Sequence, residues 1–96
     1  MFEHQKIRIG RRYIEAISIN LQSKNFILLK GSKGYVMCGY LNLSAAEKFN
    51  DVAAKVVGVS SIQQALEARV YSCSRQAKKL GIFPGQSIKE ALKIIA

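Results

Sequence analysis

The sequence predicts a single α+β domain spanning residues 1–96. Its parts are an N-terminal antiparallel β-meander of about four strands, a β-α-β crossover adding a fifth strand, and three C-terminal helices packed on the sheet. Residues 1–41 are mainly β, because apolar and polar residues alternate there with a period of two between glycine-containing turns. Residues 42–96 are mainly helical, because serine caps precede apolar residues at helical spacing. A chain of 96 residues, 49% of them apolar and one of them proline, has the composition of one folded domain.

Four short runs with strand character make up the predicted meander. The strands are expected at residues 6–9, 12–21, 26–30 and 35–41, and the turns at residues 10–11, 22–25 and 31–34. Gly31 and Gly34 are expected to allow positive φ in the last turn. In the second strand Ile17, Ile19 and Leu21 alternate with polar residues, so we expect these three side chains on the covered face.

The last two strands, FILLK and GYVMCGYL, are apolar on both faces. Such strands usually lie in the middle of a sheet that is covered on both sides. A chain this short lacks the helices to cover both faces completely. We therefore expect copies of the chain to pack together as a homo-oligomer through the N-terminal β region.

Three serines begin capping boxes, in which a hydroxyl and a returning Glu or Gln side chain satisfy amides at a helix start. The boxes are Ser44–Glu47, Ser60–Gln63 and Ser87–Glu90. The first helix should end near Asn50, and the β-branched run at residues 53–59 should then form a fifth strand parallel to the fourth. A further helix is expected at residues 72–80, ended by Gly81 and a hydrophobic contact of Ile82.

The charge is strongly positive, +9, from 15 Lys and Arg residues against six Asp and Glu residues. Such a field attracts anions, including nucleic acid. Lys and Arg on the solvent-exposed faces of helices explain the same charge more simply, so nucleic-acid binding is not favoured.

Several classes of site are excluded by the sequence itself. Phosphate-loop, dinucleotide, HExxH and GxSxG motifs are absent, and His4 is the single histidine. Cys38 and Cys73 have no metal or redox spacing, so we expect free thiols, no metal and no cofactor. The longest uncharged stretch, residues 34–46, is shorter than the about 20 residues of a membrane span, so we expect a soluble, cytoplasmic protein without a membrane partner.

The candidate site lies where the fourth and fifth strands end. If these strands are parallel, their C-terminal ends meet at one edge of the sheet, where ligands bind in many α/β proteins. The candidate ligand-binding residues are Cys38, Gly39, Asn42, Gly58, Ser60 and Ser61. Cys38 is also the weak candidate for a nucleophile, although a free cysteine inside an apolar run is equally typical of a small core residue.

Three segments carry a resemblance to a known family: KGYVMCGYLN (33–42), DVAAKVVGV (51–59) and AKKLGIFPGQSIKEAL (77–92). From Ile14 onward the chain resembles the YunC-like family, domain of unknown function 1805. The resemblance implies an α+β domain whose N-terminal β segment forms a tetramer, and a recurring MCG segment at residues 37–39. This chain departs from the family in having Gln86 where Met is common. The resemblance supplies no activity.

The sequence leaves three functions open. The first is a non-catalytic, oligomeric binding or regulatory module with its ligand near Cys38, Gly39 and Ser60. The second is a thiol-dependent enzyme that uses Cys38, although the sequence shows no base to assist it. The third is a nucleic-acid-binding protein that uses the basic C-terminal helices.

Overall fold

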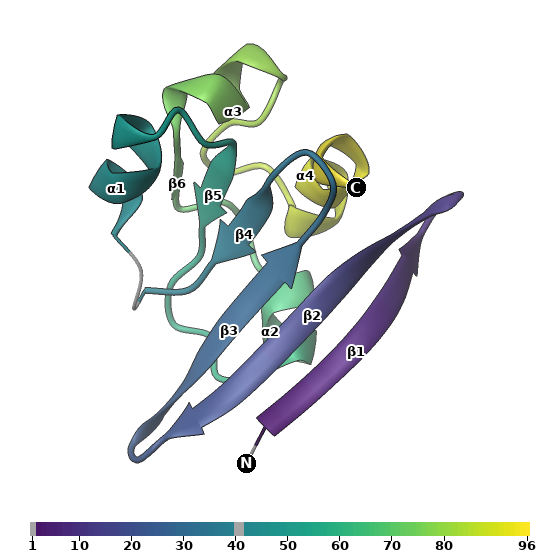
Figure 1. Ribbon diagram of the computed structural model, residues 1–96, viewed down its shortest axis with the longest axis vertical. Coiled ribbons are helices and arrows are strands. Elements are labelled where there is room, and N and C mark those ends of the chain that lie inside the picture. The colour runs from purple at the N-terminus through teal and green to yellow at the C-terminus, as the bar shows by residue number, and fades with distance from the viewer. Residues whose placement is uncertain (1, 40–41) are drawn as a thin grey trace.

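The computed structural model describes residues 2–39 and 42–96 and confirms the predicted α+β class (Figure 1). Six strands form one mixed sheet in the order β1-β2-β3-β4-β5-β6. The strands are β1 (Phe2–Ile9), β2 (Arg12–Leu21), β3 (Lys24–Lys30), β4 (Tyr35–Met37), β5 (Ala53–Lys55) and β6 (Ser72–Cys73). The helices are α1 (Leu43–Lys48), α2 (Ile62–Leu66), α3 (Arg75–Lys79) and α4 (Ile88–Ile95).

The strand pairing follows the predicted topology. Strands β1 to β4 form an antiparallel meander, and β4 pairs in parallel with β5 across the α1 crossover. The sixth strand was not predicted. Ser72 and Cys73 pair with β5 instead of opening a helix, so the helix expected at residues 72–80 begins only at Arg75. Cys73 is buried opposite Ala54, and Ser74 then caps the shortened helix.

Two of the three predicted caps are displaced. Helix α1 is capped by Asn42, whose side chain accepts from the amide of Ser44, and α2 is capped by Ser61 rather than Ser60. In both places a polar side chain one or two residues from the expected cap is the one in position to accept the amide hydrogen bond. The third prediction is confirmed, because Ser87 caps α4 by accepting from the amide of Glu90.

The end of α3 matches its prediction. Gly81 has φ 102°, and its amide donates to the carbonyl of Lys78. The amide of Ile82 donates to the carbonyl of Ala77, and its side chain is buried. This pair of bonds is the Schellman arrangement, in which glycine takes the left-handed position after the helix.

The inner face of the sheet lies against α2 and α4 (Figure 1). On β2 its buried residues are Ile14, Ala16 and Ser18, so the prediction that Ile17, Ile19 and Leu21 lie on the covered face was wrong. Helix α2 packs against β2, and the small Ala16 and Ser18 side chains leave room for it. The larger isoleucines point to the opposite, outer face.

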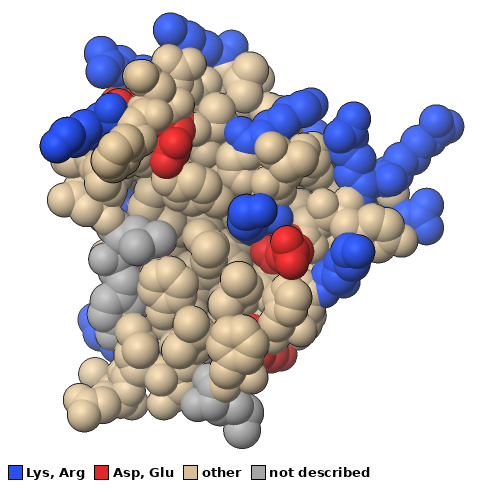
Figure 2. Space-filling model, viewed as in Figure 1, with Lys and Arg blue, Asp and Glu red and all other residues tan. Residues whose placement is uncertain are grey.

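The outer face is covered over one half only. Helix α1 lies over β4 and β5, where Met37, Ala46 and Ala53 form a small second core. The outer face of β1–β3 has no helix over it among the described residues, and Ile17, Ile19 and Leu28 are half-buried there. Figure 2 shows this face, with Lys and Arg mostly along its upper and right margins and few charges over the lower part of the meander.

The turn at residues 31–34 needs glycine for a different reason from the one predicted. Neither Gly31 nor Gly34 has positive φ. A Cβ on Gly34 would instead overlap the carbonyl and side chain of Val52, and one on Gly31 would lie 2.5 Å from the carbonyl oxygen of Ile95. Close backbone approach therefore selects glycine at both positions.

Over the part of the chain that the structure describes, no helix is both long and apolar enough to cross a membrane.

Candidate functional site

A cleft of about 560 Å³ opens where β4 ends, between the β2–β3 turn and the segment that follows β5. Its volume lies within the range typical of ligand pockets. The lining residues are Ser23, Lys24, Asn25, Cys38, Gly39, Val57, Gly58, Val59 and Ser60. Four of the six predicted site residues are among them: Cys38, Gly39, Gly58 and Ser60.

The cleft exists where β4 ends, because β3 extends past that end on one side and the chain that follows β5 continues on the other. Strand β4 ends at Met37 and pairs with β3 only over Leu28–Lys30. Strand β3 starts four residues earlier, at Lys24, and the chain after β5 runs on to Val59 before α2 begins. The part of β3 before Leu28 and the segment after β5 therefore flank the cleft. The predicted strand at residues 35–41 was too long, since Cys38 and Gly39 are not in the strand, and Tyr40 and Leu41 lie outside the described residues.

Cys38 is a buried residue at this site, with 3% of its surface exposed. Its amide donates to the carbonyl of Ile27 at 3.2 Å, and its Sγ accepts from the amide of Ile27 at 3.4 Å. The sulfur thus satisfies a main-chain amide that β4 no longer pairs. This gives Cys38 a structural role at the same position where it lines the cleft.

The other cysteine lies away from the cleft. Cys73 is buried in β6, and its Sγ donates to the carbonyl of Ile82 at 3.6 Å. Burial raises the pKa of the Cys73 thiol, which favours its protonated, unreactive form.

Gly39 and Gly58 leave space in the cleft. A Cβ built on either residue would meet none of the described atoms within 4 Å. Gly58 has φ 72°, a conformation that turns the chain from β5 toward α2 and that favours glycine. Gly39 has no such requirement, so a larger side chain there would enter open space without straining the backbone.

A hydrogen bond joins the two walls of the cleft. Asn25 Nδ2 donates to the carbonyl oxygen of Ser60 at 2.6 Å, and Asn25 Oδ1 accepts from Asn20 Nδ2 at 2.8 Å. The sequence analysis did not identify Asn25. The register of the β2–β3 hairpin, which pairs Asn20 with Asn25, is the signal that would have brought the two amides together.

The two remaining predicted residues, Asn42 and Ser61, are helix caps and do not line the cleft. Ser60 does line it, but its amide and hydroxyl both donate to Gln64 Oε1, at 2.8 and 2.9 Å. The hydroxyl of Ser60 therefore serves the start of α2. Its carbonyl serves Asn25.

Among the described residues that line the cleft, Lys24 is the one charged residue, and none carries a carboxylate or an imidazole. His4 lies on β1, where its Nε2 is 3.1 Å from Glu15 Oε1. Among the described residues no cluster of three His, Cys, Asp or Glu side chains could hold a metal ion. The chemistry available in the cleft is that of a thiol, an ammonium group, hydroxyls, amides and apolar surface.

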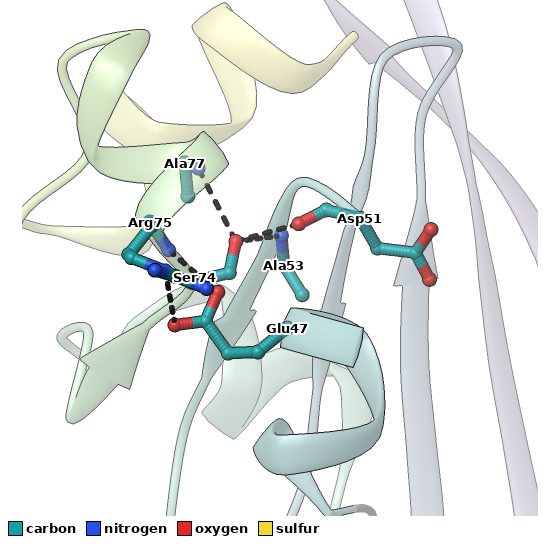
Figure 3. Close-up of polar contacts among 6 residues, drawn as sticks. All are labelled: Glu47, Asp51, Ala53, Ser74, Arg75 and Ala77. Atoms are coloured by element: carbon teal, nitrogen blue, oxygen red, sulfur yellow. Dashed lines mark hydrogen bonds and ion pairs between the residues drawn. The ribbon is translucent and has the colours of Figure 1, made fainter. Parts of the chain in front are cut away.

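A second polar cluster joins α1, β5 and α3 (Figure 3). Ser74 is fully buried. Its Oγ donates to the carbonyl of Asp51 at 2.7 Å and accepts from the amides of Ala53 and Ala77 at 3.1 and 3.2 Å. Glu47 accepts from the amide of Arg75 at 2.9 Å and forms an ion pair with its side chain at 3.5 Å. These groups satisfy one another, so the cluster holds the fold together.

Comparison with known proteins places the chain in a family. The model of a domain of unknown function (DUF1805) matches residues 37–95. The "Uncharacterized protein YunC" of Bacillus subtilis (strain 168) is 38% identical over 90 residues, which cover 90% of this chain and 89% of that protein. The crystal structure of TA1206 from Thermoplasma acidophilum, a protein of unknown function, has a TM-score of 0.96 and 34% identity and covers 100% of this chain and 94% of that one. The resemblance inferred from the MCG and LGIFPG segments is therefore confirmed, and the chain belongs to the YunC-like family of proteins that contain DUF1805.

Proposed function

We propose that this protein is a non-catalytic binding or regulatory module whose ligand occupies the cleft at the end of β4. The observation that carries the proposal is the convergence of two distant segments. Cys38–Gly39 and Gly58–Ser60 line one cleft of about 560 Å³, and two of these residues are glycines that leave space. A pocket with apolar walls and a few polar groups is the usual form of a ligand site.

The chemistry of the lining supports binding over catalysis. The Cys38 sulfur already accepts a main-chain hydrogen bond, and no carboxylate or imidazole stands among the lining residues to act as a base. A thiol-dependent enzyme that uses Cys38 is the alternative function for the same cleft. It would need the Cys38 thiolate, because the thiolate is the nucleophilic form of cysteine.

Alkylation distinguishes these two uses. For a binding module we expect Cys38 in the folded protein to resist iodoacetamide throughout the neutral pH range, with Cys73 as the buried reference. Rapid, stoichiometric alkylation of Cys38 before unfolding would favour the thiol enzyme.

The proposed module is a homo-oligomer assembled through the outer face of β1–β3. Three half-buried side chains on that face, Ile17, Ile19 and Leu28, support this proposal, because a second copy would remove their apolar surface from water. The family resemblance implies four copies.

A native mass spectrum of protein purified from its own host tests both parts of the proposal. We expect a mass above the single-chain 10.6 kDa and a bound molecule that survives transfer. The Gly39→Val variant should keep the subunit count and lose the bound molecule, because its side chain fills open space in the cleft. The control variant Ser32→Val, in an exposed turn at the other end of β3, should keep both. If Gly39→Val kept the bound molecule at wild-type occupancy, the cleft would not be its site.

A further inference from the structure

A cluster of basic residues lies at one end of the β-meander. The β1–β2 turn and the β3–β4 turn share this end of the sheet, because β2 begins there and β3 ends there, at Lys30 opposite Glu15 (Figure 1). Figure 2 shows Lys and Arg side chains around this projecting part of the molecule. Six residues, all exposed, form what we term the basic end: Lys6, Arg8, Arg11, Arg12, Lys30 and Lys33.

Helix faces do not by themselves explain the positive charge of the chain. The four helices together carry six of the 15 Lys and Arg residues, which are Lys48, Arg75, Lys78, Lys79, Lys89 and Lys93. The basic end holds as many on two adjoining turns and the strand ends beside them. The positive charge is therefore concentrated on the meander as well as spread over the helices.

The cations of the basic end are not neutralised within the chain. Glu15 lies opposite Lys6 and Lys30 in the strand register, but its Oε1 is 3.1 Å from His4 Nε2. His4 lies opposite Ile17, farther from the β1–β2 turn than Glu15. Among the described residues, none of the ion pairs includes a residue of the basic end. These cations are therefore available to an anionic partner.

An exposed aromatic ring lies among these cations. Tyr13 is 53% exposed on β2, opposite Arg8, and Lys6 Nζ lies 5.5 Å from the centroid of its ring as a cation–π contact. Strand β3 does not reach Tyr13, because its pairing with β2 begins only at Glu15. A hollow of about 360 Å³ lies between the hairpin and the β3–β4 turn, and its lining includes Lys6, Tyr13, Lys30 and Ser32.

We propose that the basic end binds single-stranded nucleic acid, with its cations on the phosphates and Tyr13 stacked against a base. This goes beyond the proposed function, because it uses a different surface from the cleft. A positive surface along the phosphate backbone, combined with an aromatic side chain on which a base stacks, is the usual form of a single-strand site. A duplex offers phosphates but keeps its bases in the stack, so an exposed Tyr13 favours a single strand.

A second copy of the chain fits the basic end less well. It carries the same charge of +9, so contact there would bring like charges together. The apolar side chains through which copies are proposed to pack, Ile17, Ile19 and Leu28, lie farther along the strands from the β1–β2 turn. A membrane surface also fits less well, because Gly10 and Arg11 at the tip of the hairpin offer no apolar side chain for insertion.

The test measures binding of the full chain to fluorescent oligothymidine and oligouridine, each about 12 nucleotides long, at about 50 mM salt. We expect the tighter-binding of the two to bind more strongly than a DNA duplex of the same length. The affinity should fall as the salt concentration rises. If all six cations contact phosphates, the slope of log K against log salt should be about −4.

Matched charge variants locate the site. Arg11→Gln with Arg12→Gln should weaken binding by at least about tenfold and make the slope less negative by about 1.4, because two phosphate contacts are lost. Lys78→Gln with Lys79→Gln removes the same charge from exposed positions of α3 and should change the affinity and the slope much less. Tyr13→Ala should weaken binding by about fivefold or more, whereas Tyr13→Phe keeps the ring and should bind nearly as the wild type does.

A second charge pair tests the basic end from a separate segment of the chain. Lys30→Gln with Lys33→Gln, at the β3–β4 turn, should weaken binding and reduce the salt dependence as the hairpin pair does. Thermal unfolding of every variant separates a lost site from a lost fold.

Four results would overturn the proposal. The first is no binding of either oligonucleotide at about 50 mM salt, where the electrostatic attraction is strong. The second is an equal loss in the α3 variant and in the basic-end variants, which would assign binding to the net charge alone. The third is tighter binding of the duplex with no loss in Tyr13→Ala, which would leave no part for base stacking. The fourth is tighter binding of polyglutamate or of anionic phospholipid vesicles than of either oligonucleotide, which would identify an acidic protein or a membrane as the occupant.

Discussion

The two halves of the sheet differ in how they are covered. The half formed by β4 and β5 lies between α1 on the outer face and the main core on the inner face. Among the described residues, the half formed by β1–β3 has a core on the inner face only. Leu28 and Met37 show where the change occurs. They are paired neighbours on the outer face, yet Met37 is 1% exposed under α1 and Leu28 is half-buried.

This difference shows what a short chain can cover by itself. Helix α1 has six residues and ends at Lys48, so it reaches only the strands next to it in the crossover. The apolar outer face of β1–β3 is therefore covered either by another molecule or by water. If the two halves differ in the same way in solution, substitutions on the covered and uncovered faces should have different effects.

The largest expected effect contrasts two neighbouring leucines of β3. Leu29 is fully buried on the inner face, so Leu29→Ala should lower the free energy of unfolding by about 3 kcal/mol. Leu28→Ala on the outer face should cost about 1 kcal/mol at low protein concentration, because its side chain is only half-buried within one chain. Urea unfolding of both variants measures these losses.

The loss of unfolding free energy in Leu28→Ala should also depend on the protein concentration. If a second copy covers this face, the loss should grow as the protein concentration rises, since association stabilises the folded state. A loss as large as that of Leu29→Ala at every concentration would show that a single chain already buries Leu28.

The next effect concerns the polar cluster of the covered half (Figure 3). Ser74→Ala should lower the free energy of unfolding by about 2–3 kcal/mol, because it leaves the buried amides of Ala53 and Ala77 without their acceptor. Ser87→Ala is the matched control, a helix cap that accepts one amide at an exposed site, and should cost about 1 kcal/mol. Equal losses for the two serines would mean that water replaces the Ser74 hydroxyl.

A smaller effect, on self-association, is expected from a substitution on the outer face of β1–β3. Ile17→Lys places an ammonium group on the outer face of β2 and should weaken self-association by about tenfold or more, because burying an unpaired charge in an interface is unfavourable. Sedimentation at micromolar concentration should show the wild type as an oligomer and the variant shifted toward 10.6 kDa. The control Ser44→Lys, at an exposed position of α1, should sediment as the wild type does. A wild type that sediments as a stable single chain would contradict assembly through this face.

The sequence predicted the elements better than it predicted their faces. The meander, the parallel crossover and the end of α3 follow from local signals, such as turns, capping serines and Gly81. The faces of β2 did not follow, because apolar residues occupy both: Ile14 and Ala16 on one, Ile17 and Ile19 on the other. Which face receives α2 is decided by tertiary packing, and the period of two is the same for both choices.

The candidate site was also predictable only in part, because its residues depend on both strand pairing and strand length. The parallel pairing of β4 and β5 brings Cys38–Gly39 close to Gly58–Ser60, and that pairing could be predicted from the crossover. The contribution of Ser23, Lys24 and Asn25 depends on β4 ending at Met37 while β3 starts earlier, a difference in strand length that the apolar run GYVMCGYL conceals. Ser74 was missed because two of its three partners, Asp51 and Ala53, lie more than 20 residues earlier in the chain.

The smallest expected effect lies at the first strand of the covered half. Tyr35 donates a hydrogen bond to Asp51 Oδ2 at 2.7 Å. Burial, this hydrogen bond and the charge of Asp51 together raise the pKa of Tyr35 to about 12 from 10.0. The folded state therefore keeps the phenol proton between pH 10 and 12, where the unfolded chain releases it, so this group's contribution to stability is complete below pH 10 and falls as the pH rises toward 12.

Comparison of the wild type with Tyr35→Phe isolates that contribution from other titrating groups. The wild type should be the more stable below pH 10, and the difference in the free energy of unfolding should shrink as the pH approaches 12. Asp51→Asn should reduce this pH dependence, because it removes the charge that opposes phenolate formation. A stability difference that stayed constant across this window would show that Tyr35 is open to solvent. Tyr35 lies on β4 and packs against the small core under α1. That result would therefore also mean that α1 covers less of β4 than the structure shows.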